Sequence, residues 1–209
     1  MKENHELPEG IQALGIPLPE EAIDRFERYL DLLEKWNAVI NLTAVRDRAR
    51  MVTLHLLDSL TVVSRLSGKT RLLDVGSGGG MPGIPLAIAL PRLQVTLLEP
   101  NQKKAAFLRQ AKLELGLENV QVVAERVECW QTDDRFDAIV SRAFSDLPDF
   151  VAGARRLLSP EGSIIAMKGV VPFEEISRLA PDLTPEVIPV VVPHLSAERH
   201  LIVIGATRT

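Results

Sequence analysis

The sequence lacks the features that define disulfide-rich and membrane proteins. It contains a single cysteine, Cys129, so no internal disulfide can form and a disulfide-stapled fold is excluded. No apolar run approaches the roughly 18 residues of a membrane-spanning helix, because Pro189 and Pro193 interrupt even the apolar stretch over residues 187–193. The first ten residues, MKENHELPEG, are polar and acidic, unlike a signal peptide. We therefore expect a cytoplasmic protein without a membrane partner.

An excess of positive charge is also absent. The net charge is −4, so any nucleic-acid partner has to be met by a local basic face. No cluster of histidines, cysteines or paired carboxylates stands at the spacing of metal ligands, and we expect no metal. A chain of 209 residues with 46% hydrophobic content is ample for a globular core.

The most informative stretch is a glycine-rich turn in the segment TRLLDVGSGGGMPGIPLAIAL, residues 70–90. Residues 72–75 form a short apolar run bounded by polar residues, which predicts a buried strand, and a helical pattern follows over residues 84–90. Strand, glycine turn and helix together present a helix N-terminus and bare backbone N–H groups to a ligand. The glycines of the turn are Gly76, Gly78, Gly79, Gly80 and Gly83.

Two motifs fit this turn, and they imply different chemistry. Gly78, Gly80 and Gly83 match the dinucleotide-binding pattern G-x-G-x-x-G, but this match begins too far beyond the strand for a tight turn. Asp74, Gly76, Gly78 and Gly80 match D-x-G-x-G-x-G, a motif of S-adenosylmethionine-dependent methyltransferases. This match begins on the strand itself, where the Asp74 carboxylate is placed to order the turn and to lie near a cationic sulfonium. The second motif is favoured over the first, and over a glycine-rich connection without a ligand.

From residue 70 onward, strand patterns alternate with helix patterns. Such alternation predicts an α/β fold with a mainly parallel sheet and helices on both faces. With the glycine motif, it indicates the Rossmann-like fold of class I S-adenosylmethionine-dependent methyltransferases, with a seven-stranded sheet. Strands are expected at residues 72–75, 94–99, 120–124, 136–141, 163–168, 185–192 and 200–206. After the helix at 84–90, further helices are expected at residues 101–115, 147–158 and 172–181.

The N-terminal part of the chain is predicted to be helical and separate from the sheet. Apolar residues recur at three- and four-residue intervals from Ile23 to Ile40, one stripe of an amphipathic helix. The segment NAVINLT, residues 37–43, is expected to end or bend this helix before a second helix at about residues 48–66. The domains are therefore expected to be an N-terminal helical extension, 1–66, and a methyltransferase domain, 67–209, joined in one compact unit.

Three polar residues of the second helix suggest a hydrolase triad, namely His55, Asp58 and Ser59. A triad draws its members from separate segments, and neighbours on one turn of one helix cannot assemble that geometry. We interpret these residues as polar anchors between the helices and the next domain.

Residues that follow the strands are the best candidates for a site, because ligands in such sheets lie beyond the carboxyl ends of the strands. Glu99 ends the second strand, where a carboxylate can accept hydrogen bonds from both hydroxyls of a ribose. The fourth strand is followed by SRAF, residues 141–144, without the Pro-Pro-aromatic segment typical of enzymes that methylate exocyclic amines. Cys129 lies in the wrong place for the nucleophile of a pyrimidine-carbon methyltransferase. An acceptor that needs no base remains, such as guanine N7, and arginine is a natural reader of guanine.

Several blocks of the sequence, in order, resemble the bacterial small-subunit ribosomal RNA guanine-N7 methyltransferases, formerly called glucose-inhibited division protein B. The resemblance covers about residues 20 to 205. The blocks are Trp36-Asn37 with Ile40-Asn41-Leu42-Thr43, His55-Leu-Leu-Asp58-Ser59-Leu60, Asp74-Val-Gly-Ser-Gly-Gly-Gly-Met-Pro-Gly83, Arg126-Val127-Glu128, Ser141-Arg142-Ala143, Lys168-Gly169 and Glu198-Arg199-His200-Leu201.

The resemblance implies methyl transfer from S-adenosylmethionine to N7 of a guanine in the 530 loop of 16S rRNA. It implies cofactor binding by Gly76, Met81, Val127, Glu128 and Arg142, to which the motif and the strand ends add Asp74, Gly78 and Glu99. The family often has Phe at position 81 and Asp at position 99, where this chain has Met and Glu. No general base is expected, since N7 carries a lone pair. The candidates for positioning guanine and RNA are Arg126, Arg142, Lys168 and Arg199.

The expected partner is 16S rRNA or the small ribosomal subunit, bound by a monomer. Two alternatives stay open on the residues alone. One is a methyltransferase that acts on a small molecule or a protein, and the other is a non-catalytic rRNA-binding assembly factor with the same fold. Transfer of a labelled methyl group to RNA, to protein or to nothing separates the three.

Overall fold

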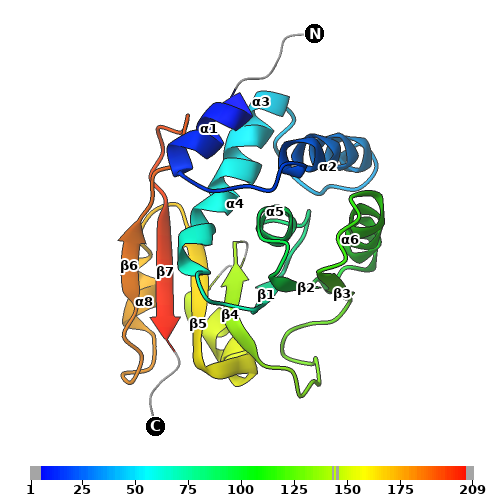
Figure 1. The fold of residues 1–209 in the computed structure, drawn as a ribbon. Coiled ribbons are helices and arrows are strands. Elements are labelled where there is room, and N and C mark those ends of the chain that lie inside the picture. The colour runs from blue at the N-terminus through cyan, green and yellow to red at the C-terminus, as the bar shows by residue number, and fades with distance from the viewer. Residues whose placement is uncertain (1–5, 143, 145, 206–209) are drawn as a thin grey trace.

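A computed structural model of the chain describes residues 6–142, 144 and 146–205 (Figure 1). Its centre is a seven-stranded sheet in the order β3-β2-β1-β4-β5-β7-β6. Strands β1 to β5 run parallel, and β7 is antiparallel to both β5 and β6. The predicted mainly parallel α/β sheet is confirmed. The strands are β1 Arg71–Val75, β2 Gln94–Leu98, β3 Val120–Val123, β4 Phe136–Ser141, β5 Leu158–Lys168, β6 Glu186–Pro189 and β7 His200–Gly205.

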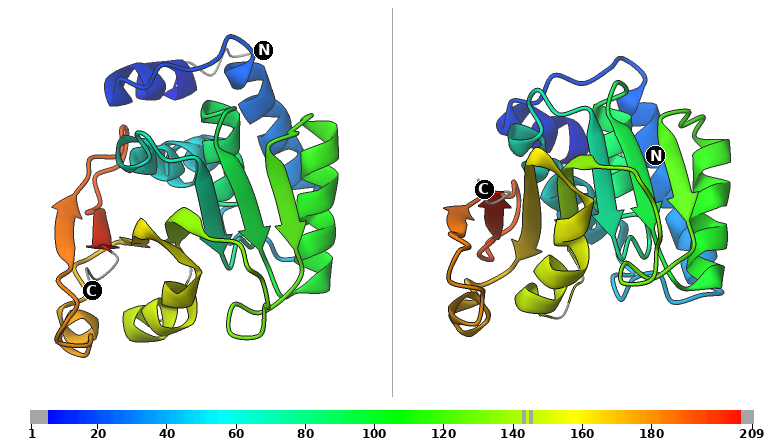
Figure 2. Two further views of the ribbon diagram at one scale, coloured as in Figure 1. Left: turned by 60° about the horizontal axis from the view of Figure 1, so that its bottom comes forward. Right: turned by 90° about the horizontal axis from the view of Figure 1, so that it is seen from below.

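Helices cover both faces of the sheet (Figure 2), and each face has its own apolar core. The helices α1 to α6 share one core with one face, and α7 and α8 pack on the other. Among the described residues, no helix is long and apolar enough to cross a membrane. The helices are α1 Glu6–Leu14, α2 Ala22–Asn37, α3 Arg48–Met51, α4 Asp58–Leu60, α5 Gly83–Ala89, α6 Gln102–Glu114, α7 Leu147–Ala154 and α8 Phe173–Ser177.

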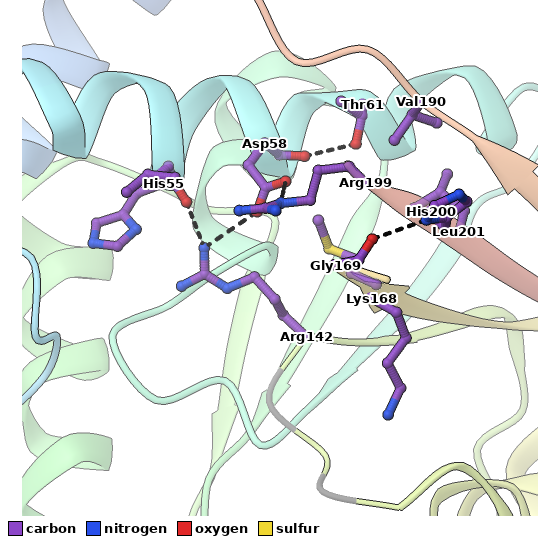
Figure 3. A pocket seen from close by; sticks show the side chains of 12 residues that line it. His55, Asp58, Thr61, Arg142, Lys168, Gly169, Val190, Arg199, His200 and Leu201 are labelled. Carbon is purple, nitrogen blue, oxygen red and sulfur yellow. Dashed lines mark hydrogen bonds and ion pairs between the residues drawn. The ribbon is translucent and has the colours of Figure 1, made fainter. Parts of the chain in front are cut away.

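The predicted second N-terminal helix is helical throughout, but it changes type along its length. A π-helical segment, Val52–Leu57, joins α3 to α4, and a 3₁₀ segment, Thr61–Arg65, follows α4. Isolated π-helical turns within α-helices occur frequently at functional sites. His55 of this segment and Asp58 of α4 line a cavity together with residues at the end of β5 (Figure 3).

The bend after α2 is confirmed, and its cause is the Asn37 side chain. Oδ1 of Asn37 accepts hydrogen bonds from the backbone N–H groups of Leu42 and Thr43, at 2.9 and 3.0 Å. Nδ2 of Asn37 donates to the carbonyl oxygen of Thr43 at 3.0 Å. The buried side-chain amide of Asn37 therefore bonds the backbone of residues 42 and 43 and holds the chain in the bend that ends α2. The sequence analysis assigned no element to the segment that forms α1.

The start of β5 differs from the prediction, which placed the strand at residues 163–168. Leu158 already pairs with Phe136, and after a register shift Ser163 pairs with Ala138. The residues in between form an irregular bulge that contains Pro160, which has no N–H to donate to a ladder. The helix predicted to reach residue 158 is α-helical to Ala154 and continues as a 3₁₀ segment, Arg155–Leu157, up to the start of β5.

Gly83 begins α5 and packs directly against β1 and β2. A Cβ atom there would collide with the buried side chain of Leu97 and would lie 2.7 Å from Oδ2 of Asp74. Gly83→Ala is therefore expected to lower the free energy of unfolding by about 1–3 kcal/mol in urea denaturation. Gly205→Ala is the matched control, because no described residue other than its chain neighbours has a heavy atom within 4 Å of its added Cβ. A loss no larger than that of the control would contradict the tight packing of α5 on the sheet.

Candidate active site

The glycine turn is fastened to the neighbouring strand β2. The backbone N–H groups of Gly76 and Ser77 both donate to the carbonyl oxygen of Leu98, at 2.8 and 3.3 Å. Gly76, Gly78 and Gly80 have φ values of 73°, 56° and 91°, a region that side chains with a Cβ rarely adopt. The turn thus needs glycine at these positions for its backbone path, as the motif indicated.

Asp74 supports the turn from the buried end of β1. Its Oδ2 accepts a hydrogen bond from the backbone N–H of Gly83 at 3.0 Å, which links the strand to the start of α5. Its Oδ1 is buried and has no hydrogen-bond partner among the described residues. Burial raises the pKa of Asp74 from 3.8 to about 7, against the opposing effects of the Gly83 N–H, Ser77 and Arg142. A polar oxygen without a partner at the base of the turn fits a site that is completed by a ligand.

Glu99 supports the same turn from β2. Its Oε2 accepts a hydrogen bond from the backbone N–H of Gly78 at 2.8 Å, and its Oε1 accepts one from Asn101 at 2.9 Å. Contact with a ribose stays a prediction. The structure adds that the carboxylate also fixes the backbone of Gly78, which the sequence pattern did not indicate.

A small cavity of about 120 Å³ lies beyond the carboxyl ends of β1 and β2. It is lined by three of the predicted cofactor-binding residues, Gly76, Val127 and Glu128. Arg126 and Phe144 also line it, whereas Ala143 of the predicted strand-end motif lies outside the described residues. This position next to the glycine turn is where a parallel α/β sheet binds its nucleotide-like ligands.

A larger cavity of about 340 Å³ lies at the same edge of the sheet, between the π-helical segment with α4 and the ends of β5 and β7 (Figure 3). Three predicted basic residues line it, Arg142 after β4, Lys168 at the end of β5 and Arg199 before β7. Arg126 lines the small cavity instead of this one, because it follows β3, which is separated from β4 and β5 by β2 and β1. Its role in positioning guanine or RNA stays a prediction.

Arg142 connects the larger cavity to the glycine turn. Its Nη2 approaches Sδ of Met81 in the turn at 3.4 Å, and its Nη1 donates to the carbonyl oxygen of Leu54 at 2.9 Å. The same Nη1 lies 3.7 Å from Oδ2 of Asp58. Arg142 therefore contacts both the predicted cofactor site and the wall of the larger cavity. This position is compatible with both predicted roles, cofactor binding and the positioning of guanine or RNA.

The two other basic residues of the larger cavity are held by carboxylates. Nε of Arg199 donates to Oδ1 of Asp58 at 3.1 Å. Nζ of Lys168 forms an ion pair with Oε2 of Glu175 in α8 at 2.8 Å. All three basic side chains keep partial exposure, so they remain able to exchange a partner for an anionic ligand.

His55 and Asp58 are the residues whose place in the site the sequence analysis missed. Interpreted only as anchors, both line the larger cavity while each is at least 95% buried. Nε2 of His55 lies 2.8 Å from Oγ1 of Thr43, and burial with the nearby Arg142 guanidinium lowers the pKa of His55 from 6.5 to about 4. Burial raises the pKa of Asp58, opposed by Arg142 and Arg199. The signal available in the sequence was the block His55-Leu-Leu-Asp58-Ser59-Leu60, one of the blocks that carry the family resemblance.

Comparison with known proteins decides between the interpretations left open by the geometry. Residues 22–202 match the family model GidB, described as rRNA small subunit methyltransferase G. The chain belongs to this family. The protein named ribosomal RNA small subunit methyltransferase G from Chromobacterium violaceum is 57% identical over 198 residues, which cover 94% of this chain and 95% of that protein. The protein of the same name from Neisseria meningitidis serogroup B is 50% identical, covering 98% and 99% of the two chains.

Solved structures confirm the fold. The O-methyltransferase TomG from Streptomyces achromogenes in complex with SAM aligns over 99% of both chains with a TM-score of 0.62 and 18% identity. The O-methyltransferase from Bacillus cereus in complex with SAH covers 85% of this chain and 90% of that one, with a TM-score of 0.59 and 19% identity. Membership in the rRNA small subunit methyltransferase G family confirms the predicted enzyme class, a methyltransferase with S-adenosylmethionine as its cofactor.

Proposed function

We propose that this member of the family transfers a methyl group from S-adenosylmethionine to N7 of a guanine in the 530 loop of 16S rRNA. The observation that carries the proposal is a basic cavity that opens at the same edge of the sheet as the glycine turn, with Arg142 in contact with both. The family membership and the rRNA named for its relatives support an RNA substrate.

The cofactor is assigned to the glycine turn and the small cavity beside it. Gly76, Gly78 and Met81 of the turn offer backbone carbonyl oxygens, since their N–H groups already donate within the protein, and Glu99 offers carboxylate lone pairs to a ribose. Val127 and Glu128 line the small cavity and are assigned to the nucleobase of the cofactor. Asp74 orders the turn from below through Gly83.

The chemistry requires positioning more than acid–base catalysis. S-adenosylmethionine bound there would supply an electrophilic methyl group. The lone pair of guanine N7 would form the new N–C bond as the methyl–sulfur bond breaks, and S-adenosylhomocysteine would be the leaving group. No proton has to leave N7 for the methyl group to be transferred, so the reaction requires no general base. The protein's part is therefore to align the two reactants and to shape the electrostatic field around them.

The three basic side chains of the larger cavity are assigned to the RNA backbone. A phosphate is a better partner for Lys168 than water, and it can compete with Glu175 because that ion pair is partly exposed. The substrate is either naked rRNA or the assembled small subunit, and the protein acts on it as a monomer.

A transfer assay tests the proposal. Purified protein with methyl-labelled S-adenosylmethionine is offered 16S rRNA, small ribosomal subunits, a mixture of cellular proteins and a small-molecule extract. Label is expected in 16S rRNA, as naked RNA, in subunits or in both. Label only in protein or in small molecules would contradict the substrate, and RNA binding without transfer would indicate an assembly factor.

Lys168 and Arg199 give a quantitative prediction for RNA binding. Replacing either by alanine is expected to weaken RNA binding and to reduce the slope of log K against log salt by about one phosphate contact. Binding of S-adenosylhomocysteine is expected to survive, since neither residue contacts the glycine turn. The control is Arg25→Ala, because Arg25 pairs with Glu21 at the start of α2 and lines neither cavity. Unaltered salt dependence in both cavity variants would assign these side chains to the scaffold.

A further inference from the structure

Guanine presents two different edges, and only one of them faces the methyl donor. N7 lies beside the acceptor O6, so methylation at N7 turns this edge toward the cofactor. The opposite edge carries two donors, N1–H and the N2 amine, which need acceptors when the base leaves water. A protein that selects guanine therefore needs a paired acceptor on the far side of the base, and this inference rests on the proposed function.

The larger cavity contains one side chain of that kind. Arg142, Lys168 and Arg199 are donors only, and the residues that line the cavity include a single acidic one, Asp58. Its carboxylate is 5% exposed and points between the two arginines in Figure 3. We propose that Asp58 binds the N1–H and N2 amine of the target guanine and so determines the base specificity of the enzyme.

The contacts of Asp58 leave room for this role. Oδ1 accepts one hydrogen bond, from Nε of Arg199 at 3.1 Å, and Oδ2 has the looser ion pair with Arg142 at 3.7 Å. A carboxylate offers about four lone-pair positions, two on each oxygen. Each oxygen of Asp58 therefore has a lone pair left to accept a hydrogen bond from a further donor. Burial raises the pKa of Asp58, and the two arginines oppose this by favouring the ionised form, which is the form that accepts from both donors.

The charge that develops during the reaction favours the same placement. Methylation gives the guanine ring a positive charge, which the surrounding arginines and lysine repel. A carboxylate on the far edge of the base is attracted to that charge, and the attraction is stronger in the transition state than in the bound substrate. Asp58 is thus the one charged group of this cavity, among the described residues, whose sign suits the product.

Inosine separates this role from one in which Asp58 only holds the arginines. Inosine has N7, O6 and N1–H but lacks the N2 amine, so it removes one of the two hydrogen bonds. The experiment measures kcat/KM for RNA with guanosine or inosine at the methylated position. The wild-type enzyme is expected to prefer guanosine about 10- to 100-fold, the value of one hydrogen bond to a charged acceptor.

Asp58→Ala is expected to reduce this preference to nearly one, and Asp58→Asn to an intermediate value. The ratio is independent of the fraction of active protein, so partial misfolding does not affect it, and any effect of inosine on RNA folding is common to all variants. For a variant too slow to assay, the same ratio is taken from RNA binding in the presence of S-adenosylhomocysteine. Lys168→Ala is the matched control, expected to lose RNA affinity while the preference stays at the wild-type value.

The proposal is overturned if wild-type enzyme methylates both RNAs equally, or if Asp58→Ala keeps the wild-type preference. The second result would mean that Asp58 acts only through Arg142 and Arg199. Failure of the wild-type enzyme to methylate guanosine RNA at all would instead contradict the proposed function.

Discussion

Arg142→Ala is expected to lower kcat/KM for RNA methylation by about two to three orders of magnitude, the usual effect of removing one charge-stabilising group from an active site. Arg142 contacts the glycine turn through Met81 and the larger cavity through Asp58 and the carbonyl oxygen of Leu54. Its loss leaves the buried carboxylate of Asp58 with one cation fewer and removes the link between the two halves of the site. Steady-state kinetics with RNA as the varied substrate measures the effect.

Arg142→Lys is the control for charge. Lysine keeps the positive charge but has no planar fork to reach two partners at once, so it is expected to recover less than about tenfold of the lost kcat/KM. The affinity for S-adenosylhomocysteine, measured by calorimetry, is expected to fall by less than kcat/KM does. If Arg142→Ala retained kcat/KM within about tenfold of wild type, Arg142 would be a structural residue, and the two cavities would not be coupled through it.

Asp74 is expected to make the protein less stable as the pH rises from about 4 to 7. Its pKa is about 7 in the folded protein against 3.8 when unfolded, so between these values the folded state binds the extra proton. Stability falls wherever the folded state binds more protons, by about 1.4 kcal/mol for each pH unit. The loss reaches about 4 kcal/mol at pH 7 and is complete above it.

Asp74→Asn isolates this effect, because asparagine can still accept the hydrogen bond from Gly83 and does not titrate. The measurement is the free energy of unfolding of both proteins in urea from pH 4 to 8. His55 acts in the opposite direction, since its lowered pKa of about 4 makes stability fall as the pH drops below 6.5, but it is present in both proteins and cancels in the difference. A difference between the two proteins that is constant across this range would show that Asp74 is ionised at its ordinary pKa in the folded state.

The glycine turn of the site was predictable from the sequence because it is local. The strand, the glycines with positive φ and the acid on the strand lie within ten consecutive residues, and short-range geometry dictates each of them. The order of the strand ends along the chain also indicated which residues reach the carboxyl edge. The sequence pattern does not give the order of the strands across the sheet. That order separates Arg126 from the three basic residues of the larger cavity.

The substrate half depended on contacts that no local pattern encodes. Asp58 and Arg199 are 141 residues apart and meet only because the helix after α3 crosses the sheet edge beside β7. The sequence pattern predicts one helix over residues 48–66, and only the structure shows that residues 52–57 of it are π-helical. Helix α1 was not predicted because it is short. Its nine residues include only three buried ones, too few to show the repeat of apolar residues that marks an amphipathic helix.

The most direct test of the account is to locate the transferred methyl group. Wild-type protein is incubated with S-adenosylmethionine and unmethylated 16S rRNA or small subunits, and the product is digested and analysed by mass spectrometry and by chemical cleavage at N7-methylguanine. The account predicts one new N7-methylguanosine, placed in the 530 loop. Methyl groups on an exocyclic amine, a ribose or another base, or no methylated RNA under conditions where the cofactor binds, would contradict it.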